Sequence, residues 1–133
     1  MEKKVVAVDF DGTICENAYP SIGRPNRPLI EALKFIREKE IADVILYTCR
    51  TGVHLEEAIE FCIYYGLEFD AVNQNLPRII DRFGGDTRKI FADLYIDDKT
   101  MDLSYDEEDY EFFYRNDKIA EMYVNIVENA LED

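Results

Sequence analysis

Residues 5–13 read Val-Val-Ala-Val-Asp-Phe-Asp-Gly-Thr, and the rest of the chain is organised around this stretch. Four small or β-branched apolar residues are typical of a strand that is buried on both faces. Two carboxylates, Asp9 and Asp11, follow at once. Because an unpaired buried carboxylate is costly, we expect a cation at this strand end. On a continuing strand the two side chains lean the same way, and Gly12 then permits a sharp turn.

Length and composition favour one domain that spans residues 1–133. No stretch reaches the roughly 18 apolar residues of a membrane span, and residues 1–4 lead into the first strand without a signal peptide. The cysteine count is odd and shows no Cys-x-x-Cys spacing, which indicates free thiols and a cytoplasmic location: Cys15, Cys49 and Cys62.

The formal net charge of -14 is unevenly distributed. Residues 93–133 hold 14 of the 29 acidic residues and only 3 of the 15 basic ones. Nucleic-acid-binding faces need clustered basic residues, so this charge argues against a broad surface of that kind. A solvated acidic surface is the simpler interpretation of residues 93–133.

Strand-like and helix-like segments alternate along the chain. We expect strands at 4–9, 43–47, 69–72 and 94–96, helices at 28–39, 54–65 and 107–131, and a helical turn at 77–82. This order predicts an α/β fold, a single Rossmann-like three-layer sandwich with a mainly parallel sheet and helices on both faces. The last helix should dock on the sheet.

Residues 13–27 carry turn signals and no clear periodicity. At this length they exceed the usual strand-to-helix connection of about 2–6 residues. We therefore expect an irregular loop here, and two interpretations stay open. It is either a lid over the acidic pair or a plain surface loop.

Polar residues close each expected strand. In a parallel sheet these carboxyl ends meet at one edge, where ligands bind. The residues concerned are Asp9, Asp11, Thr48, Asn73, Asp97 and Asp98. Eight basic residues fall in loops assigned to the same edge, and such a rim suits an anionic substrate such as a phosphate ester: Arg24, Arg27, Arg50, Arg78, Arg82, Arg88, Lys89 and Lys99.

Converging carboxylates without a cysteine or histidine cluster form an all-oxygen site, which suits Mg²⁺ rather than zinc. A carboxylate can also attack phosphorus and form an aspartyl-phosphate. The charge that develops on the phosphoryl oxygens then needs hydrogen-bond donors. Thr48, Lys89 and backbone N–H groups near Asp11 and Cys49 could supply them, and Arg50 is a further candidate for substrate contact.

These residues carry a resemblance to the haloacid dehalogenase superfamily. The run Asp9-Phe-Asp-Gly-Thr13 resembles its first motif, and Thr48 the second. Lys89 resembles the third motif, and Asp97-Asp98 the fourth, so the resemblance covers about residues 4 to 99. It implies a phosphatase-type domain. The chain has no insertion large enough for a cap domain, so it looks like a small capless member.

The resemblance also implies a role for each matched residue. Asp9 would be the nucleophile and a metal ligand. Asp11 would protonate the leaving group, then activate water, and bind the metal through its backbone carbonyl. Thr48 would hold a phosphoryl oxygen, and Lys89 would neutralise charge between Asp9 and the phosphate. Asp98 would bind the metal, with Asp97 orienting the site or binding the metal in its place.

The expected activity is therefore Mg²⁺-dependent hydrolysis of a phosphorylated small molecule through an aspartyl-phosphate. One alternative is a non-catalytic phospho-acceptor or binding module. Receiver domains, however, place their paired Asp after the first strand and the acceptor after the third, where this chain has Asn73. A nucleic-acid or nucleotide end phosphatase is a further alternative, which the basic rim allows and the net charge disfavours.

Overall fold

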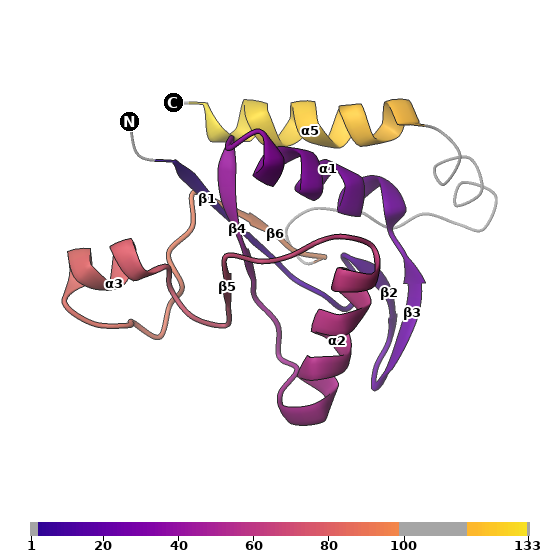
Figure 1. The fold of residues 1–133 in the computed structure, drawn as a ribbon, viewed down its shortest axis with the longest axis horizontal. Helices are drawn as coiled ribbons and strands as arrows, with labels where there is room; N and C mark the ends of the chain where they lie inside the picture. The colour runs from indigo at the N-terminus through magenta and orange to yellow at the C-terminus, as the bar shows by residue number, and fades with distance from the viewer. Residues whose placement is uncertain (1–2, 99–116, 133) are drawn as a thin grey trace.

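The computed structural model describes residues 3–98 and 117–132 (Figure 1). A four-stranded parallel sheet has the order β5-β4-β1-β6. Its strands are β1 (Lys4–Val8), β4 (Ala42–Leu46), β5 (Ala71–Val72) and β6 (Leu94–Ile96). The helices are α1 (Arg27–Glu38), α2 (Gly52–Tyr64), α3 (Pro77–Phe83) and α5 (Asp117–Leu131). The predicted α/β fold with a mainly parallel sheet is confirmed, and no cap domain is inserted within these ranges.

Both faces of the sheet are covered, as the alternation of segments predicts. Val6 and Val8 of β1 face one core cluster, to which α1, α2 and α5 contribute. Val5 and Ala7 face the other cluster, which is closed by α3 and residues 90–95. In Figure 1, α1 and α5 lie side by side along one side of the sheet, and α3 lies apart from them. The layer formed by α3 and residues 90–95 is therefore thinner than the layer formed by α1, α2 and α5.

Local sequence explains why α1 forms where it does. Its buried residues recur at helical spacing and face the core: Pro28, Leu29, Ile30, Ala32, Leu33 and Ile36. Asn26 is the N-cap, and its side-chain oxygen accepts a hydrogen bond from the N–H of Leu29. β4 is buried at all five positions, which is typical of a central parallel strand.

The predicted irregular loop at 13–27 is wrong. Two short strands, β2 (Cys15–Ala18) and β3 (Ser21–Pro25), form an antiparallel hairpin with its turn at Tyr19-Pro20. The strands pack so closely that a Cβ on Gly23 would lie 2.4 Å from the carbonyl oxygen of Glu16. The hairpin buries few apolar side chains, so the sequence lacks the alternation that identifies a strand.

The C-terminal helix helps to cover one face of the sheet, as predicted. α5 packs mainly along α1 and also contacts β6. Val127 and Leu131 are buried in that contact. Residues 107–116 of the predicted helix, and Lys99, lie outside the described residues. No helix among the described residues is long and apolar enough to cross a membrane.

We predict that Asn26→Ala destabilises the protein by about 1–2 kcal/mol. Asn26 is 2% exposed, caps α1, and also donates a hydrogen bond from Nδ2 to the Thr13 carbonyl. Thr51→Ala is the matched control, because Thr51 is the N-cap of α2 and makes no side-chain capping bond. Urea denaturation should give a lower midpoint for Asn26→Ala and a nearly unchanged one for Thr51→Ala. Equal midpoints for the two variants would contradict the cap assignment.

Candidate active site

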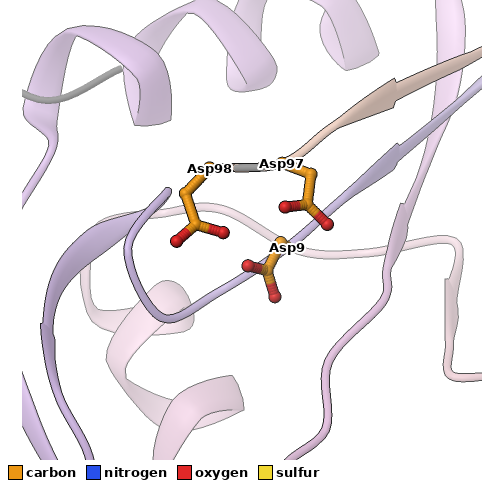
Figure 2. Close-up of side chains that lie close together, drawn as sticks. All are labelled: Asp9, Asp97 and Asp98. Carbon is orange, nitrogen blue, oxygen red and sulfur yellow. The ribbon is translucent and has the colours of Figure 1, made fainter. Parts of the chain in front are cut away.

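Three carboxylates meet at the carboxyl edge of the sheet. β1 pairs with β4 on one side and β6 on the other, so β1 lies at the switch point where ligands bind in open α/β sheets. Asp9 directly follows β1, while Asp97 and Asp98 follow β6 (Figure 2). Asp9 also donates its N–H to the Ile96 carbonyl at 2.9 Å, which ties the two strand ends together. One oxygen from each carboxylate lies within 4.8 Å of the others.

The Asp9 carboxylate is electrostatically strained in its ionised form. Burial raises its pKa, a hydrogen bond from the Phe10 N–H opposes that rise, and the charges of Asp97, Asp98 and Asp11 add to it. The net result is a pKa of about 6, against an ordinary value of 3.8. A divalent cation among the three carboxylates would reverse the unfavourable balance of charge.

Gly12 shapes the same cluster. Its φ of +84° suits glycine, and a Cβ built on it would lie 2.7 Å from Oδ2 of Asp98. The Asp98 carboxylate therefore occupies the space that a side chain at position 12 would fill. With all-oxygen donors and no histidine in the cluster, the three aspartates fit a hard cation such as Mg²⁺.

Asp11 does not join the three carboxylates as the sequence analysis predicted. β1 ends at Val8, and the N–H groups of Thr13, Ile14 and Cys15 all turn back to the Phe10 carbonyl. The strand geometry that would align Asp11 with Asp9 is therefore lost. The Asp11 carboxylate instead accepts two hydrogen bonds from Arg50, each at 2.8 Å. The predicted metal contact of its backbone carbonyl stays a prediction.

The structure also corrects the prediction that Arg50 contacts substrate. Its side chain is 1% exposed. All five of its N–H groups donate to protein acceptors, namely the two Asp11 oxygens and the carbonyls of Pro20, Ser21 and His54. Arg50 is buried because its charge and every donor are matched inside the protein.

Thr48 stands at the end of β4, next to the end of β1, as predicted. Its N–H donates to Oδ1 of Asn73, a residue held at a φ of +52° directly after β5. Its hydroxyl oxygen accepts the N–H of Arg50 at 3.2 Å, which leaves the hydroxyl hydrogen free to bond an anion. Cys49 is a free, exposed thiol beside it.

Lys89 lies in an exposed stretch, and it lines a shallow hollow with Phe91 and Tyr95. The contact described for Lys89 is through its backbone carbonyl, which accepts a hydrogen bond from Oγ1 of Thr87. Within residues 3–98 and 117–132 no described contact joins it to the three aspartates. Its role in neutralising phosphate charge stays a prediction.

The predicted basic rim does not form as a set. Arg78 pairs with Asp43 at the start of β4 and donates to the Lys3 carbonyl, so it lies at the opposite, amino edge. Arg24 pairs with Glu16 on the hairpin, and Arg27 stacks on the ring of Tyr65 at 4.9 Å. The sequence placed these bases in loops but could not show to which edge each loop returns.

A hollow of about 340 Å³ at the amino edge is a poorer candidate site. It contains the Arg37–Asp70 pair, in which Nη2 and Oδ1 are 3.1 Å apart, and the Lys3–Asp43 pair at 3.1 Å. Lys3 and Arg37 are therefore already paired with acidic residues of the same hollow. We place the candidate active site at the carboxyl edge, on Asp9, Asp97 and Asp98.

Fold and site together define an α/β protein with an acidic cluster at the carboxyl edge of a parallel sheet. The chain is similar to a solved structure described as the conserved protein coded by a locus from Bacteroides thetaiotaomicron. The two share 39% sequence identity over 85% of this chain and 88% of that chain, with a TM-score of 0.67. The chain belongs to the same family as that conserved protein, whose description names no activity. No family model and no curated protein matches the chain.

We predict that Asp9→Asn stabilises the chelator-treated protein at neutral pH. Between pH 3.8 and about 6 the folded state holds a proton on Asp9 that the unfolded chain has released. The stabilising contribution of protonated Asp9 is thus present at low pH and lost as the pH rises through about 6. Asparagine cannot ionise, so it avoids that loss.

The measurement is the melting temperature of the two proteins from about pH 4 to about pH 8. The advantage of Asp9→Asn should grow up to about pH 6 and then stay constant. Asp81→Asn, which removes an exposed carboxylate on α3, controls for the loss of one negative charge. If the difference in melting temperature between wild type and Asp9→Asn does not vary with pH, the pKa of Asp9 is not raised in the folded protein.

A second prediction concerns Gly12→Ala, which should weaken Mg²⁺ binding on the order of 10- to 100-fold, because the new methyl group displaces the Asp98 carboxylate. Gly84→Ala is the matched control, since Gly84 has a similar φ of +75° and no atom within 4 Å of an added Cβ. Both variants place an alanine at a positive φ. Titration calorimetry with Mg²⁺ should separate them, and equal affinities would exclude Asp98 as a ligand.

Proposed function

We propose that the protein is a Mg²⁺-dependent phosphomonoester hydrolase that works through an aspartyl-phosphate on Asp9. The observation that carries the proposal is the cluster of Asp9, Asp97 and Asp98 at the carboxyl ends of adjacent parallel strands. A cation bound there would relieve the repulsion among these carboxylates. A cation held by several carboxylates beside a free carboxylate oxygen suits the binding and attack of a phosphate group.

Asp9, Asp97 and Asp98 would hold the ion. When bound, Mg²⁺ neutralises negative charge on the carboxylates and on the phosphoryl oxygens that approach them. In this arrangement one oxygen of Asp9 stays available to the substrate. Gly12 supports the proposed place of Asp98 in the site, because the missing side chain lets the Asp98 carboxylate lie against the backbone.

Asp9 would act as the nucleophile. One of its oxygens forms a bond to phosphorus as the ester P–O bond breaks, and the leaving oxygen takes a proton. Water then attacks the phosphorus of the aspartyl-phosphate, which releases phosphate and regenerates the carboxylate. Because the pKa of Asp9 is about 6, most of the carboxylate is ionised at neutral pH.

Asp11 would donate the proton to the leaving oxygen and later receive one from water. Its carboxylate is 19% exposed and follows Asp9 by two residues, so it borders the site on the side of the hairpin. Thr48 would donate its hydroxyl hydrogen to a phosphoryl oxygen, since its hydroxyl oxygen already accepts from Arg50. Lys89, the residue that matches the third motif, would neutralise phosphate charge.

The substrate we propose is a phosphorylated small molecule in the cytoplasm. Three cysteines without a disulfide fit a reducing compartment. Arg50 is internally satisfied and Arg78 lies at the far edge, so neither offers its charge to a phosphate backbone at the carboxyl edge. This supports a small phosphate ester over an oligonucleotide end.

Asp9→Asn should lower phosphate release from an aryl phosphate by roughly 10³-fold or more, since the residue forms the covalent bond. The assay measures multiple turnovers with and without Mg²⁺. Asp81→Asn should keep wild-type activity, because its carboxylate lies on α3 and takes no part in the cluster.

Three outcomes would contradict the proposal in different ways. Equal activity of wild type and Asp9→Asn would show that Asp9 is not the nucleophile. Activity that persists in the presence of a chelator would show that the reaction does not require a metal ion. A single turnover, with one phosphate retained per chain, would favour the phospho-acceptor module instead.

A further inference from the structure

The guanidinium of Arg50 joins three separate elements of the fold, namely the turn after β1, the β2–β3 hairpin and the start of α2. Nε and Nη2 donate to the Asp11 carboxylate, both at 2.8 Å. Nη1 and Nη2 also donate to the carbonyls of Pro20 and Ser21 in the hairpin turn, at 3.2 and 2.9 Å. Nη1 further donates to the carbonyl of His54 in the first turn of α2, at 3.3 Å. One side chain therefore fixes Asp11, the hairpin and the start of α2 together.

Two aromatic rings complete the surroundings of this group. The guanidinium carbon lies 5.0 Å from the ring centre of Phe10 and 5.1 Å from that of Tyr19. Tyr19 in turn meets the His54 ring edge-on at 5.7 Å. A planar guanidinium suits five diverging acceptors and two ring faces at once, whereas a lysine ammonium has three donors and no plane.

This arrangement couples the place of Asp11 to the place of the hairpin. Both Asp11 oxygens and both turn carbonyls depend on the same group, so a shift of the turn pulls on the carboxylate. Arg50 itself is 1% exposed and cannot reach a substrate. Any effect it has on the reaction must pass through the groups that it holds, and of the partners of its guanidinium Asp11 is the one with a proposed role in proton transfer.

We infer that Arg50 is a positioning residue, which holds Asp11 in the orientation needed for proton transfer and locks the β2–β3 hairpin beside the site. The inference rests on the proposed function, in which Asp11 moves the proton. It adds a residue that the sequence analysis assigned to substrate contact, and it gives the hairpin a part in the reaction.

The test is a double-mutant cycle of Arg50→Lys and Asp11→Asn, with kcat and KM measured on phenyl phosphate in the presence of Mg²⁺. Arg50→Lys should lower kcat on the order of 10²-fold, because the carboxylate is misplaced, and change KM little. Asp11→Asn should lower kcat by about 10²- to 10⁴-fold. The double variant should be no slower than Asp11→Asn, because Arg50 then has nothing left to position.

Arg37→Lys is the matched control. Arg37 also forms a two-pronged pair with an aspartate, donating from Nε and Nη2 to Asp70 at 3.2 and 3.1 Å, but at the amino edge. It should lower stability without changing kcat. If it lowers kcat as much as Arg50→Lys does, the effect of Arg50 is general destabilisation and the inference fails.

A second readout does not depend on activity or on an Arg50 variant that folds. Hydrogen exchange should be faster in residues 17–24 of Asp11→Asn than of wild type, because the neutral amide weakens the hold of Arg50 on the turn. Unchanged exchange there would overturn the coupling. Multiplicative losses of kcat in the double variant would overturn the inference and leave the phosphatase proposal intact, whereas an inactive wild type would overturn both.

Discussion

The pairing of β1 with β6 is the constraint on which the candidate site depends. It brings Asp9 beside Asp97 and Asp98, which lie almost 90 residues further along the chain. The raised pKa of Asp9 reflects the cost of burying this carboxylate, to which the charges of the neighbouring acids add. Sheet hydrogen bonds and the burial of Val6, Val8 and Ile96 oppose that cost, so the core of the sheet holds the acids in place.

Phe10 links the apolar core to the polar site. It lies between Asp9 and Asp11 in the sequence and is fully buried. Its ring meets Phe61 of α2 edge-on, and its ring centre lies 5.0 Å from the Arg50 guanidinium carbon. One face of the turn after β1 thus packs on apolar side chains, while the other presents carboxylates. The burial of Phe10 thus anchors the turn that carries Asp9 and Asp11 to the apolar core.

Much of the fold could be predicted from local pattern. The apolar run at Val5–Val8 and the helical stripe of α1 each bury a continuous set of residues, and both elements form close to their predicted bounds. The hairpin escaped prediction because its strands are short and half-exposed. The strands approach closely at Gly23, and Arg50, 29 residues further along the chain, donates a hydrogen bond to the Ser21 carbonyl; a periodicity of apolar residues reveals neither contact.

By itself the sequence determined that two of the strands, 4–9 and 94–96, end in acids, and the α/β order determined that those ends share an edge. The meeting of Asp9, Asp97 and Asp98 follows from these two facts, because the carboxyl ends of neighbouring parallel strands lie at the same edge of the sheet. Only the tertiary structure decided where Asp11 and Arg50 point. Their orientation is set by a buried charge that must find all its partners, and those partners come from segments that no local pattern connects.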